Sequence, residues 1–203
     1  MRRRQHVNPL AYEFEILHGQ APQLATDRKL EIEIGCADAQ FLFERAQRCP
    51  DRQYIGFEVR KSIVDEVNAR ANGTIPVEAV FCNANHHLRK MLPDNSTARV
   101  YLNFPDPWFK RRHHKRRVIT TDLAKDLYAV LEADGHLLIQ TDIWAIAIEA
   151  MDVFERLDSL YHNCATPWTF WKRANPYGAK SWREAYCERN QRKVWRLLYH
   201  VIK

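Results

Sequence analysis

One aspartate stands between two prolines in the segment Asn103-Phe104-Pro105-Asp106-Pro107-Trp108. Proline fixes its own φ angle and restricts the residue before it to extended conformations. The two prolines therefore hold a rigid turn that aims the carboxylate of Asp106 in one direction. A carboxylate fixed in this way can stabilise positive charge that develops on a substrate. Asp106 is the first candidate for a catalytic residue.

A run of potential cations follows this turn, from Lys110 to Arg117. A charged run is usually a solvated loop. This run begins four residues after Asp106, at the mouth of the expected cleft. Repulsion among its cations would destabilise the site unless a polyanion relieved it. The formal net charge of +6 also favours a polyanionic partner. We therefore predict a nucleic-acid surface whose phosphate contacts are Arg111, Arg112, Lys115 and Arg116. Further basic residues are Arg2, Arg3, Arg4, Arg189, Arg192 and Lys193.

Polar side chains also follow three other apolar runs of the kind that form buried strands. Glu33 and Gly35 end the first run, Glu58 the second and Asn83 the third. Doubly wound sheets bind ligands outside the carboxyl ends of their strands. Glu58 comes 23 residues after Gly35, where an acidic residue can accept hydrogen bonds from ribose hydroxyls. The Asn83 amide could pair with adenine, so these residues together favour a nucleoside cofactor.

The turn after the first run lacks most of the glycines that cradle a pyrophosphate. Only Gly35 is present, and Ala37 and Ala39 stand where such loops often have glycine. S-adenosylmethionine contains no phosphate, so the missing glycines argue more strongly against a nicotinamide dinucleotide. The turn therefore favours methyl transfer over the competing interpretation, an NAD-dependent oxidoreductase.

Apolar runs of strand type alternate with helical patterns along most of the chain. The expected strands are Leu30–Ile34, Tyr54–Val59, Val77–Cys82, Val100–Phe104 and His136–Thr141. The expected helices are Ala39–Cys49, Ile63–Ala71, His87–Met91, Asp122–Leu131 and Trp144–Leu157. This alternation predicts an α/β fold with a doubly wound, mostly parallel sheet. The alternating segment Val194–Ile202 adds a late antiparallel strand near the sheet edge.

The length of 203 residues suits one domain with a substantial core. We expect a basic lead-in over residues 1–28, with a short helix around Tyr12–Leu17, and a single domain over residues 29–203. No apolar run reaches the roughly 20 residues that cross a membrane, and no apolar segment follows the basic start. A cytoplasmic protein without a membrane partner is therefore expected.

Cysteine and histidine residues give no metal signature. The five cysteines are scattered, which predicts reduced thiols rather than zinc or disulfides. The pairs His86-His87 and His113-His114 have no acidic or cysteine ligand beside them. Aromatic side chains near the end could stack on a base, although we expect at least half of them in the core. They are Trp168, Phe170, Trp171, Tyr177 and Trp182.

With these residues assembled, the sequence resembles the tRNA (guanine-N7)-methyltransferase family over nearly the whole chain. The most specific match is Phe104–Arg117, which is similar to the family's FPDPW segment and the basic KxRHxKRR stretch that follows it. Supporting matches are Glu33-Ile34-Gly35, Gly56–Arg60, Asn83-Ala84, Thr141-Asp142, Arg4–Leu10 and Ser181–Glu184.

The resemblance implies a Rossmann-like class I methyltransferase that uses S-adenosylmethionine to methylate N7 of a guanine in the tRNA variable loop. It also implies that Asp106 is the catalytic carboxylate. The implied cofactor-binding residues are Glu33, Gly35, Glu58, Arg60, Asn83, Ala84, Asn103 and Asp106. The implied substrate-binding residues are Lys110, Asp142, Ser181, Trp182, Arg183 and Glu184. The expected partner is tRNA, bound by a monomer or homodimer without a helper subunit.

The sequence departs from the family pattern in two places. Ala37 and Ala39 replace residues that are glycine in at least part of the family, and a positive φ would strain an alanine there. Arg183 replaces the aromatic residue of a T-x-aromatic-E motif. The alternative interpretation is therefore a tRNA-binding protein of the same fold that has lost methyl transfer.

Overall fold

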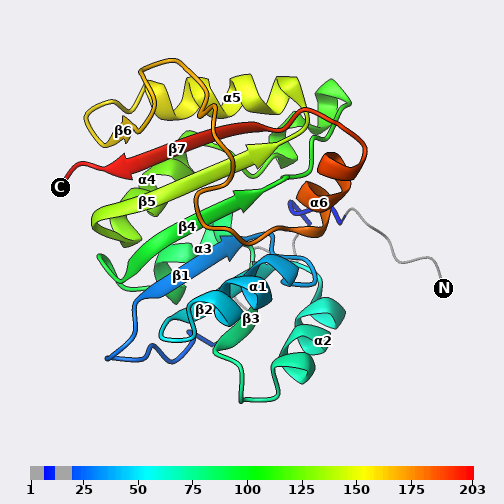
Figure 1. Cartoon of the computed structure of the whole chain (residues 1–203), viewed down its shortest axis with the longest axis vertical. Coiled ribbons are helices and arrows are strands. Elements are labelled where there is room, and N and C mark those ends of the chain that lie inside the picture. The colour runs from blue at the N-terminus through cyan, green and yellow to red at the C-terminus, as the bar shows by residue number, and fades with distance from the viewer. Residues whose placement is uncertain (1–6, 12–19) are drawn as a thin grey trace.

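A seven-stranded sheet with the order β3-β2-β1-β4-β5-β7-β6 forms the centre of the protein (Figure 1). The structure is a computed structural model that describes residues 7–11 and 20–203. Strands β1 to β5 pair in parallel, whereas β7 runs antiparallel to both β5 and β6. The strands are β1 (Leu30–Ile34), β2 (Gln53–Glu58), β3 (Val77–Phe81), β4 (Thr97–Asn103), β5 (Leu131–Thr141), β6 (Tyr161–Asn163) and β7 (Trp195–Val201).

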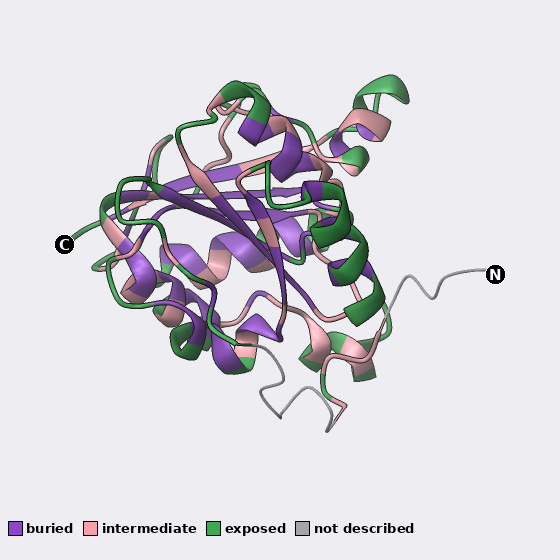
Figure 2. Ribbon diagram, turned by 90° about the horizontal axis from the view of Figure 1, so that it is seen from below, coloured by how far each residue is buried: buried purple, intermediate pink, exposed green. Residues whose placement is uncertain are grey.

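Helices cover both faces of this sheet. Buried residues of α1 and α2 join one apolar cluster, and those of α3, α4 and α5 join another on the opposite face. Figure 2 shows the buried strands between these two layers. The short helices η2 and α6 lie beyond the carboxyl ends of the strands (Figure 1). The helices are α1 (Gln40–Arg48), α2 (Lys61–Ala71), α3 (Ala84–Met91), η2 (Arg111–Arg116), α4 (Thr121–Val130), α5 (Trp144–Glu155) and α6 (Trp182–Arg189).

A buried ion cluster fixes the segment that leads to α6. Glu31, on the α1 side of β1, is fully buried and accepts hydrogen bonds from Arg45 and Tyr101. Burial raises the pKa of Glu31, but the hydrogen bonds and nearby arginines outweigh burial and lower that pKa below its usual value. Arg45 also donates to the carbonyl oxygen of Tyr177 at 3.0 Å. The sheet thereby anchors the loop that carries the start of α6.

The structure confirms the doubly wound, mostly parallel sheet and its late antiparallel strand. That strand, β7, lies second from the edge because β6 pairs with its outer side. The elements β6, α6 and η2 have no counterpart among the strands and helices expected from the sequence. Arg2–Arg4 and the expected helix Tyr12–Leu17 lie outside the described residues, and the boundary after residue 28 stays a prediction. Within residues 7–11 and 20–203, no helix has the length and apolar character needed to cross a bilayer.

Candidate active site

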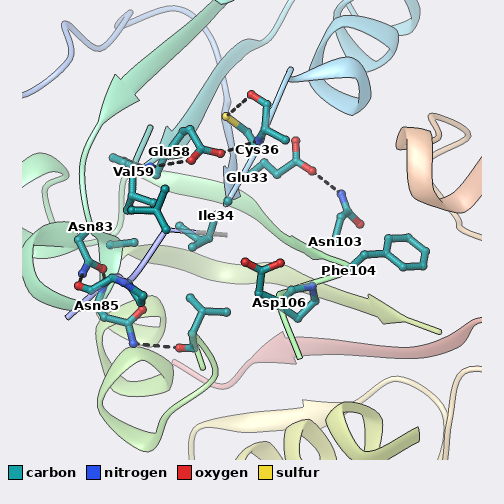
Figure 3. A pocket seen from close by; sticks show the side chains of 18 of the residues that line it. Glu33, Ile34, Cys36, Glu58, Val59, Asn83, Asn85, Asn103, Phe104 and Asp106 are labelled. Atoms are coloured by element: carbon teal, nitrogen blue, oxygen red, sulfur yellow. Dashed lines mark hydrogen bonds between the residues drawn. The ribbon is translucent and has the colours of Figure 1, made fainter. Parts of the chain in front are cut away.

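A pocket of about 530 Å³ opens at the carboxyl ends of β1, β2, β3 and β4 (Figure 3). The strand order reverses at β1, which has β2 on one side and β4 on the other. Such switch points are where doubly wound sheets bind ligands. The pocket brings together every residue predicted to bind the cofactor and three of the predicted substrate residues. The lining includes Glu33, Gly35, Glu58, Arg60, Asn83, Ala84, Asn103, Asp106, Ser181, Trp182 and Arg183.

The turn between β1 and α1 adopts a tight, left-handed path along one wall of the pocket. Gly35, Ala37 and Ala39 have φ angles of 75°, 48° and 53°. The amide of Ala37 donates to the Glu58 carboxylate at 3.1 Å. A Cβ atom at Gly56 would lie 2.4 Å from Sγ of Cys36, so glycine is required there for β2 to approach the turn. The positive φ angles of Ala37 and Ala39 show that the backbone strain expected at these two alanines is present.

Replacing one of these alanines by glycine should relieve that strain. We expect Ala37→Gly to raise the free energy of unfolding by about 0.5–1 kcal/mol, because glycine adopts positive φ without a steric penalty. Urea unfolding would measure the change. The matched control is Ala145→Gly on the exposed side of α5, which should lower stability by a similar amount. A loss of stability in both variants would contradict the strain argument.

Glu58 is buried, and its carboxylate is already heavily engaged. It accepts hydrogen bonds from the amides of Ala37, Val59 and Arg60, and two more from the Arg60 guanidinium at 2.8 Å each. The hydrogen bonds to Glu58 raise the pKa of Arg60. A carboxylate offers about four lone-pair positions. A ribose hydroxyl can therefore bind Glu58 only if the Arg60 side chain gives up at least one of its bonds.

Glu33 presents a buried oxygen to the pocket. Its side chain is 3% exposed, and Oε1 accepts a hydrogen bond from Asn103 at 2.8 Å (Figure 3). Oε2 has no hydrogen-bond partner among the described residues. Burial is the main cause that raises the pKa of Glu33 to about 8, and the negative charges of Asp38 and Glu58 add to it. A cationic donor inside the pocket would supply the missing partner.

Asn83 connects the pocket to the N-terminal segment. Its side-chain oxygen caps α3 by accepting from the amide of Asn85, and its nitrogen donates to the carbonyl oxygen of Pro9 at 2.8 Å. Val7, Pro9 and Leu10 consequently line the pocket. The sequence of this segment indicates a family resemblance but not a place in the site.

Asp106 lies at the exposed mouth of the same pocket, in the loop after β4. Figure 3 shows its carboxylate turned toward the space bounded by Glu33 and Asn83. Phe104 and Trp108, on either side of the proline pair, have φ angles of 50° and 43°. Positive φ is unfavourable for bulky residues and is often found where a backbone positions a functional group. Phe104 therefore does not adopt the extended conformation that we expected before Pro105, and the loop is strained on both sides of the proline pair.

Comparisons with known proteins bear on what this pocket does. A family model described as "Putative methyltransferase" matches residues 27–197. The tRNA (guanine-N(7)-)-methyltransferase of Synechococcus elongatus is 34% identical over 208 residues, which cover 98% of this chain and 96% of that protein. The chain belongs to this methyltransferase family. The protein of the same name from Synechocystis sp. is 35% identical, with the same two shares covered.

Solved structures of more distant proteins share the fold. The 16S rRNA methyltransferase KamB aligns with a TM-score of 0.60 at 12% identity, over 88% of this chain and 90% of that chain. The aminoglycoside resistance methyltransferase NpmB1 aligns with a TM-score of 0.55 at 17% identity, over 88% and 89%. These likenesses confirm the class I methyltransferase fold. The comparisons give no support to a nicotinamide enzyme or to a family member without methyl transfer.

The remaining predicted substrate residues of this methyltransferase lie outside the pocket lining. Lys110 precedes η2, and Asp142 follows β5. The Asp142 carboxylate pairs with Arg183 at 2.6 Å and lies 3.9 Å from Arg192. Asp142 therefore orients Arg183, which does line the pocket.

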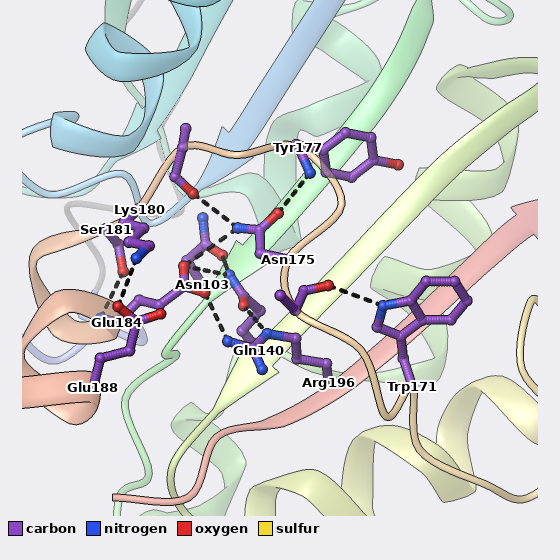
Figure 4. A network of polar contacts seen from close by, with 12 residues as sticks. Asn103, Gln140, Trp171, Asn175, Tyr177, Lys180, Ser181, Glu184, Glu188 and Arg196 are labelled. Carbon is purple, nitrogen blue, oxygen red and sulfur yellow. Dashed lines mark hydrogen bonds and ion pairs between the residues drawn. The ribbon is translucent and has the colours of Figure 1, made fainter. Parts of the chain in front are cut away.

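Glu184 is held inside the protein by a buried polar network (Figure 4). Its side chain is 1% exposed and accepts hydrogen bonds from Arg196 at 2.8 Å and from Gln140 at 3.2 Å. Gln140 also donates to Asn103, which in turn donates to Glu33. The network links the cofactor side of the pocket to the start of α6. Gln140 was missed by the sequence analysis, although a lone amide in the apolar run of β5 is a recognisable signal.

The basic run forms the short helix η2 at the pocket mouth. Lys115, Arg116 and Arg117 line the pocket, and the Arg116 guanidinium lies 5.0 Å from the ring centroid of Trp108. Arg117 donates to Pro107 and pairs with Glu149 of α5. These contacts fix the helix beside Asp106 and leave its outward face to solvent.

Proposed function

We propose that the chain transfers the methyl group of S-adenosylmethionine to N7 of a guanine in the tRNA variable loop. The observation that carries the proposal is the joint placement, at one pocket, of a buried unpartnered carboxylate oxygen, an exposed carboxylate and a helix of cations. The names of the full-length relatives supply the reaction and the nucleotide class.

The pocket fits an adenosine-type cation. S-adenosylmethionine supplies an electrophilic methyl group on a positively charged sulfur. Oε2 of Glu33 offers an acceptor to an ammonium group, and Gly35 has open space on its pocket side, where a Cβ would meet no atom within 4 Å. Together with these two residues, Glu58, Arg60, Asn83, Ala84, Asn103 and Asp106 would surround the cofactor.

The chain's own contribution to the reaction would be positioning and electrostatics. Guanine N7 carries an in-plane lone pair, so no residue has to remove a proton before attack. The purine gains positive charge as its bond to the methyl group forms, and a fixed carboxylate beside it stabilises that charge. Asp106, at the pocket mouth, would do this, and its carboxylate would also be able to accept from the N1 and N2 edge of the base.

The RNA would be held from both sides of the mouth. Ser181, Trp182 and Arg183 line one side and would contact the nucleotide, with Lys110 approaching from the other. Asp142 and Glu184 would support them through their ion pairs with Arg183 and Arg196. We further propose that the enzyme works in the cytoplasm as a monomer or homodimer without a helper subunit.

Methylation of an unmodified tRNA transcript tests the proposal. The chain would be incubated with S-adenosylmethionine carrying a labelled methyl group, and the RNA would be digested to nucleosides to identify the modified base and, in parallel, to oligonucleotides to locate it. We expect the label in 7-methylguanosine, at a variable-loop position. Cofactor binding without label in the RNA would favour a tRNA-binding protein that does not transfer the methyl group. Label in another nucleoside would refute guanine N7 as the target.

The phosphate contacts of η2 predict a change in salt dependence. Replacing Arg111, Arg112, Lys115 and Arg116 by glutamine should reduce the slope of log affinity against log salt by about 3, at about 0.7–0.9 per lost contact. Filter binding of tRNA at several salt concentrations would measure this. The control is the same charge change at the exposed residues Arg89, Lys90, Lys125 and Arg156. Equal slopes in the two variants would show that only net charge matters.

A further inference from the structure

Three aromatic side chains from different parts of the chain meet beside the pocket. Trp144 begins α5, Trp195 begins β7, and Phe170 lies in the loop between β6 and α6. The ring centroids of Trp144 and Trp195 are 4.5 Å apart, and those of Phe170 and Trp195 are 4.8 Å apart. Nζ of Lys193 lies 3.7 Å from the centroid of Trp195. We call these four residues the aromatic cluster.

The aromatic cluster presents a large apolar ring to solvent in a fixed orientation. Trp144 is 53% exposed, whereas Phe170 and Trp195 are partly buried and Phe170 packs against the core. The two inner rings therefore brace the outer one. An exposed aromatic ring with a cation beside it can serve as an interaction site, and Trp144 has no role in the function proposed above.

One side of the aromatic cluster adjoins the basic helix. Arg117, directly after η2, pairs with Glu149 of α5. Glu149 lies five residues after Trp144 on the same helix, less than two turns away. The basic helix is therefore connected to the first half of α5, at a site about 7.5 Å along the helix axis from Trp144.

The other side of the aromatic cluster adjoins the pocket mouth. Arg192 precedes Lys193, and its guanidinium lies 5.4 Å from the ring centroid of Tyr186. Trp182, which lines the pocket, stacks on the same Tyr186 ring, with 5.5 Å between the two centroids. Cations and aromatic rings therefore alternate from the mouth across α6 to Trp144.

We propose that the aromatic cluster is a second RNA contact, on which an unpaired base of the substrate stacks against Trp144 while Lys193 contacts its phosphate. The proposal rests on the proposed function, because it places more of the same RNA. Stacking on an exposed ring accepts any base, and flanking cations track the backbone of a single strand. The cations on both sides favour a polyanion over an apolar protein partner.

Two substitutions of Trp144 separate stacking from apolar packing. Trp144→Leu keeps an apolar side chain against Phe170 and Trp195 but removes the ring, and should raise the Kd for tRNA about tenfold. Trp144→Phe keeps a ring and should stay within about threefold of the unmodified chain. Fluorescence anisotropy with labelled tRNA at several salt concentrations would measure both. The salt slope should not change in either variant, because stacking releases no counterions.

Lys193→Gln tests the ionic part at an exposed position where folding is not at risk. It should reduce the salt slope by about 0.7, the value for one phosphate contact on a single strand. The affinity for S-adenosylmethionine should remain unchanged in all three variants, because none of these residues lines the pocket.

The matched control is Trp168→Leu. Trp168 is 54% exposed, much like Trp144. Its turn is tied to the far end of α5, since Asn163 donates to both Thr169 and Glu155. The same turn leads to Phe170 two residues later, so Trp168 is near the aromatic cluster, but among the described residues no ring contact joins its side chain to Trp144, Phe170 or Trp195. Trp168→Leu should therefore leave the Kd for tRNA unchanged.

Three results would overturn the inference. They are an unchanged Kd in Trp144→Leu, equal losses in Trp144→Leu and Trp168→Leu, or an unchanged salt slope in Lys193→Gln. Each applies when the unmodified chain binds and methylates tRNA, so the proposed function survives them. An unmodified chain that neither binds nor methylates tRNA would overturn the proposed function, and the aromatic cluster would lose its RNA role with it.

Discussion

Asp106→Asn should lower kcat for tRNA methylation by about 10²–10³-fold. The substitution keeps the size of the side chain and removes its negative charge, which is the feature that stabilises a purine becoming cationic. Pro105 and Pro107 and the positive φ angles of Phe104 and Trp108 hold the turn independently of this side chain. The Kd values for tRNA and for S-adenosylmethionine should therefore change less than tenfold, and the unfolding midpoint should not shift.

Single-turnover methylation at saturating tRNA and cofactor would measure this loss. The matched control is Asp122→Asn, because Asp122 is exposed and also lines the pocket. A similar loss in both variants would mean that the general negative potential of the mouth matters, and not a carboxylate fixed by the proline turn. Near-normal kcat in Asp106→Asn would remove Asp106 from the mechanism.

Glu33→Gln should change the stability of the protein in a pH-dependent way. Burial raises the pKa of Glu33 to about 8 in the folded protein, against about 4.5 for the unfolded chain. The folded state thus binds this proton more tightly, and stability falls as the pH rises from about 4.5 to about 8. Glutamine removes this penalty. The variant should be more stable than the original by about 2–4 kcal/mol at pH 8.5 and nearly equal to it at pH 4.5.

The same substitution should weaken cofactor binding. Oε2 of Glu33 would lose its capacity to accept from a cation, and a hydrogen bond to a charged group contributes about 1.5–3 kcal/mol. The Kd for S-adenosylmethionine at pH 8 should therefore rise about 10- to 100-fold. The difference between the two proteins should shrink as the pH falls below about 8, because the buried carboxyl of the original chain is then increasingly protonated.

Isothermal calorimetry and urea unfolding, each at several pH values, would test both effects. Glu78→Gln serves as the control, since Glu78 is a half-buried strand residue whose pKa is also raised by burial. It should leave cofactor binding unchanged. A Glu33→Gln variant that binds as tightly as the original chain, or that is less stable at pH 8.5, would show that Glu33 is not the buried cation acceptor.

Much of the pocket could be predicted because it obeys a rule of topology. Parallel strands present their carboxyl ends at one edge, so residues that end different strands converge there. Glu33, Glu58, Asn83 and Asn103 were found in this way and do line one pocket. The engagement of Glu58 by Arg60 could not be seen, because adjacency in sequence does not reveal which way a long side chain turns.

The region around α6 could not be predicted for a different reason. Glu184 is buried through Gln140 and Arg196, which come from two strands paired across long sequence separations. Sequence motifs placed Glu184 among the substrate contacts but could not show this burial. The aromatic residues followed the expected division, since Phe170, Trp171 and Tyr177 pack against the core while Trp168 and Trp182 are exposed.

The helix formed by the basic run could not be predicted from hydrophobic periodicity. Arg111–Arg116 contains no apolar residue from which a helical period could be recognised, so its 3-10 helix was not predicted. Its place beside Asp106 was expected because the run begins only four residues after Asp106. Proximity in sequence was informative here because the proline turn leaves the backbone between Asp106 and the basic run little conformational freedom.

The most direct test of the account compares two tRNA transcripts that differ in one atom of the target base. One contains guanosine at the methylated variable-loop position, and the other contains 7-deazaguanosine, which has a carbon in place of N7. With S-adenosylmethionine and the chain, we predict one methyl group per tRNA on the first transcript and none on the second, with equal Kd values for both. Methylation of the deaza transcript, or of neither transcript, would contradict methyl transfer to guanine N7.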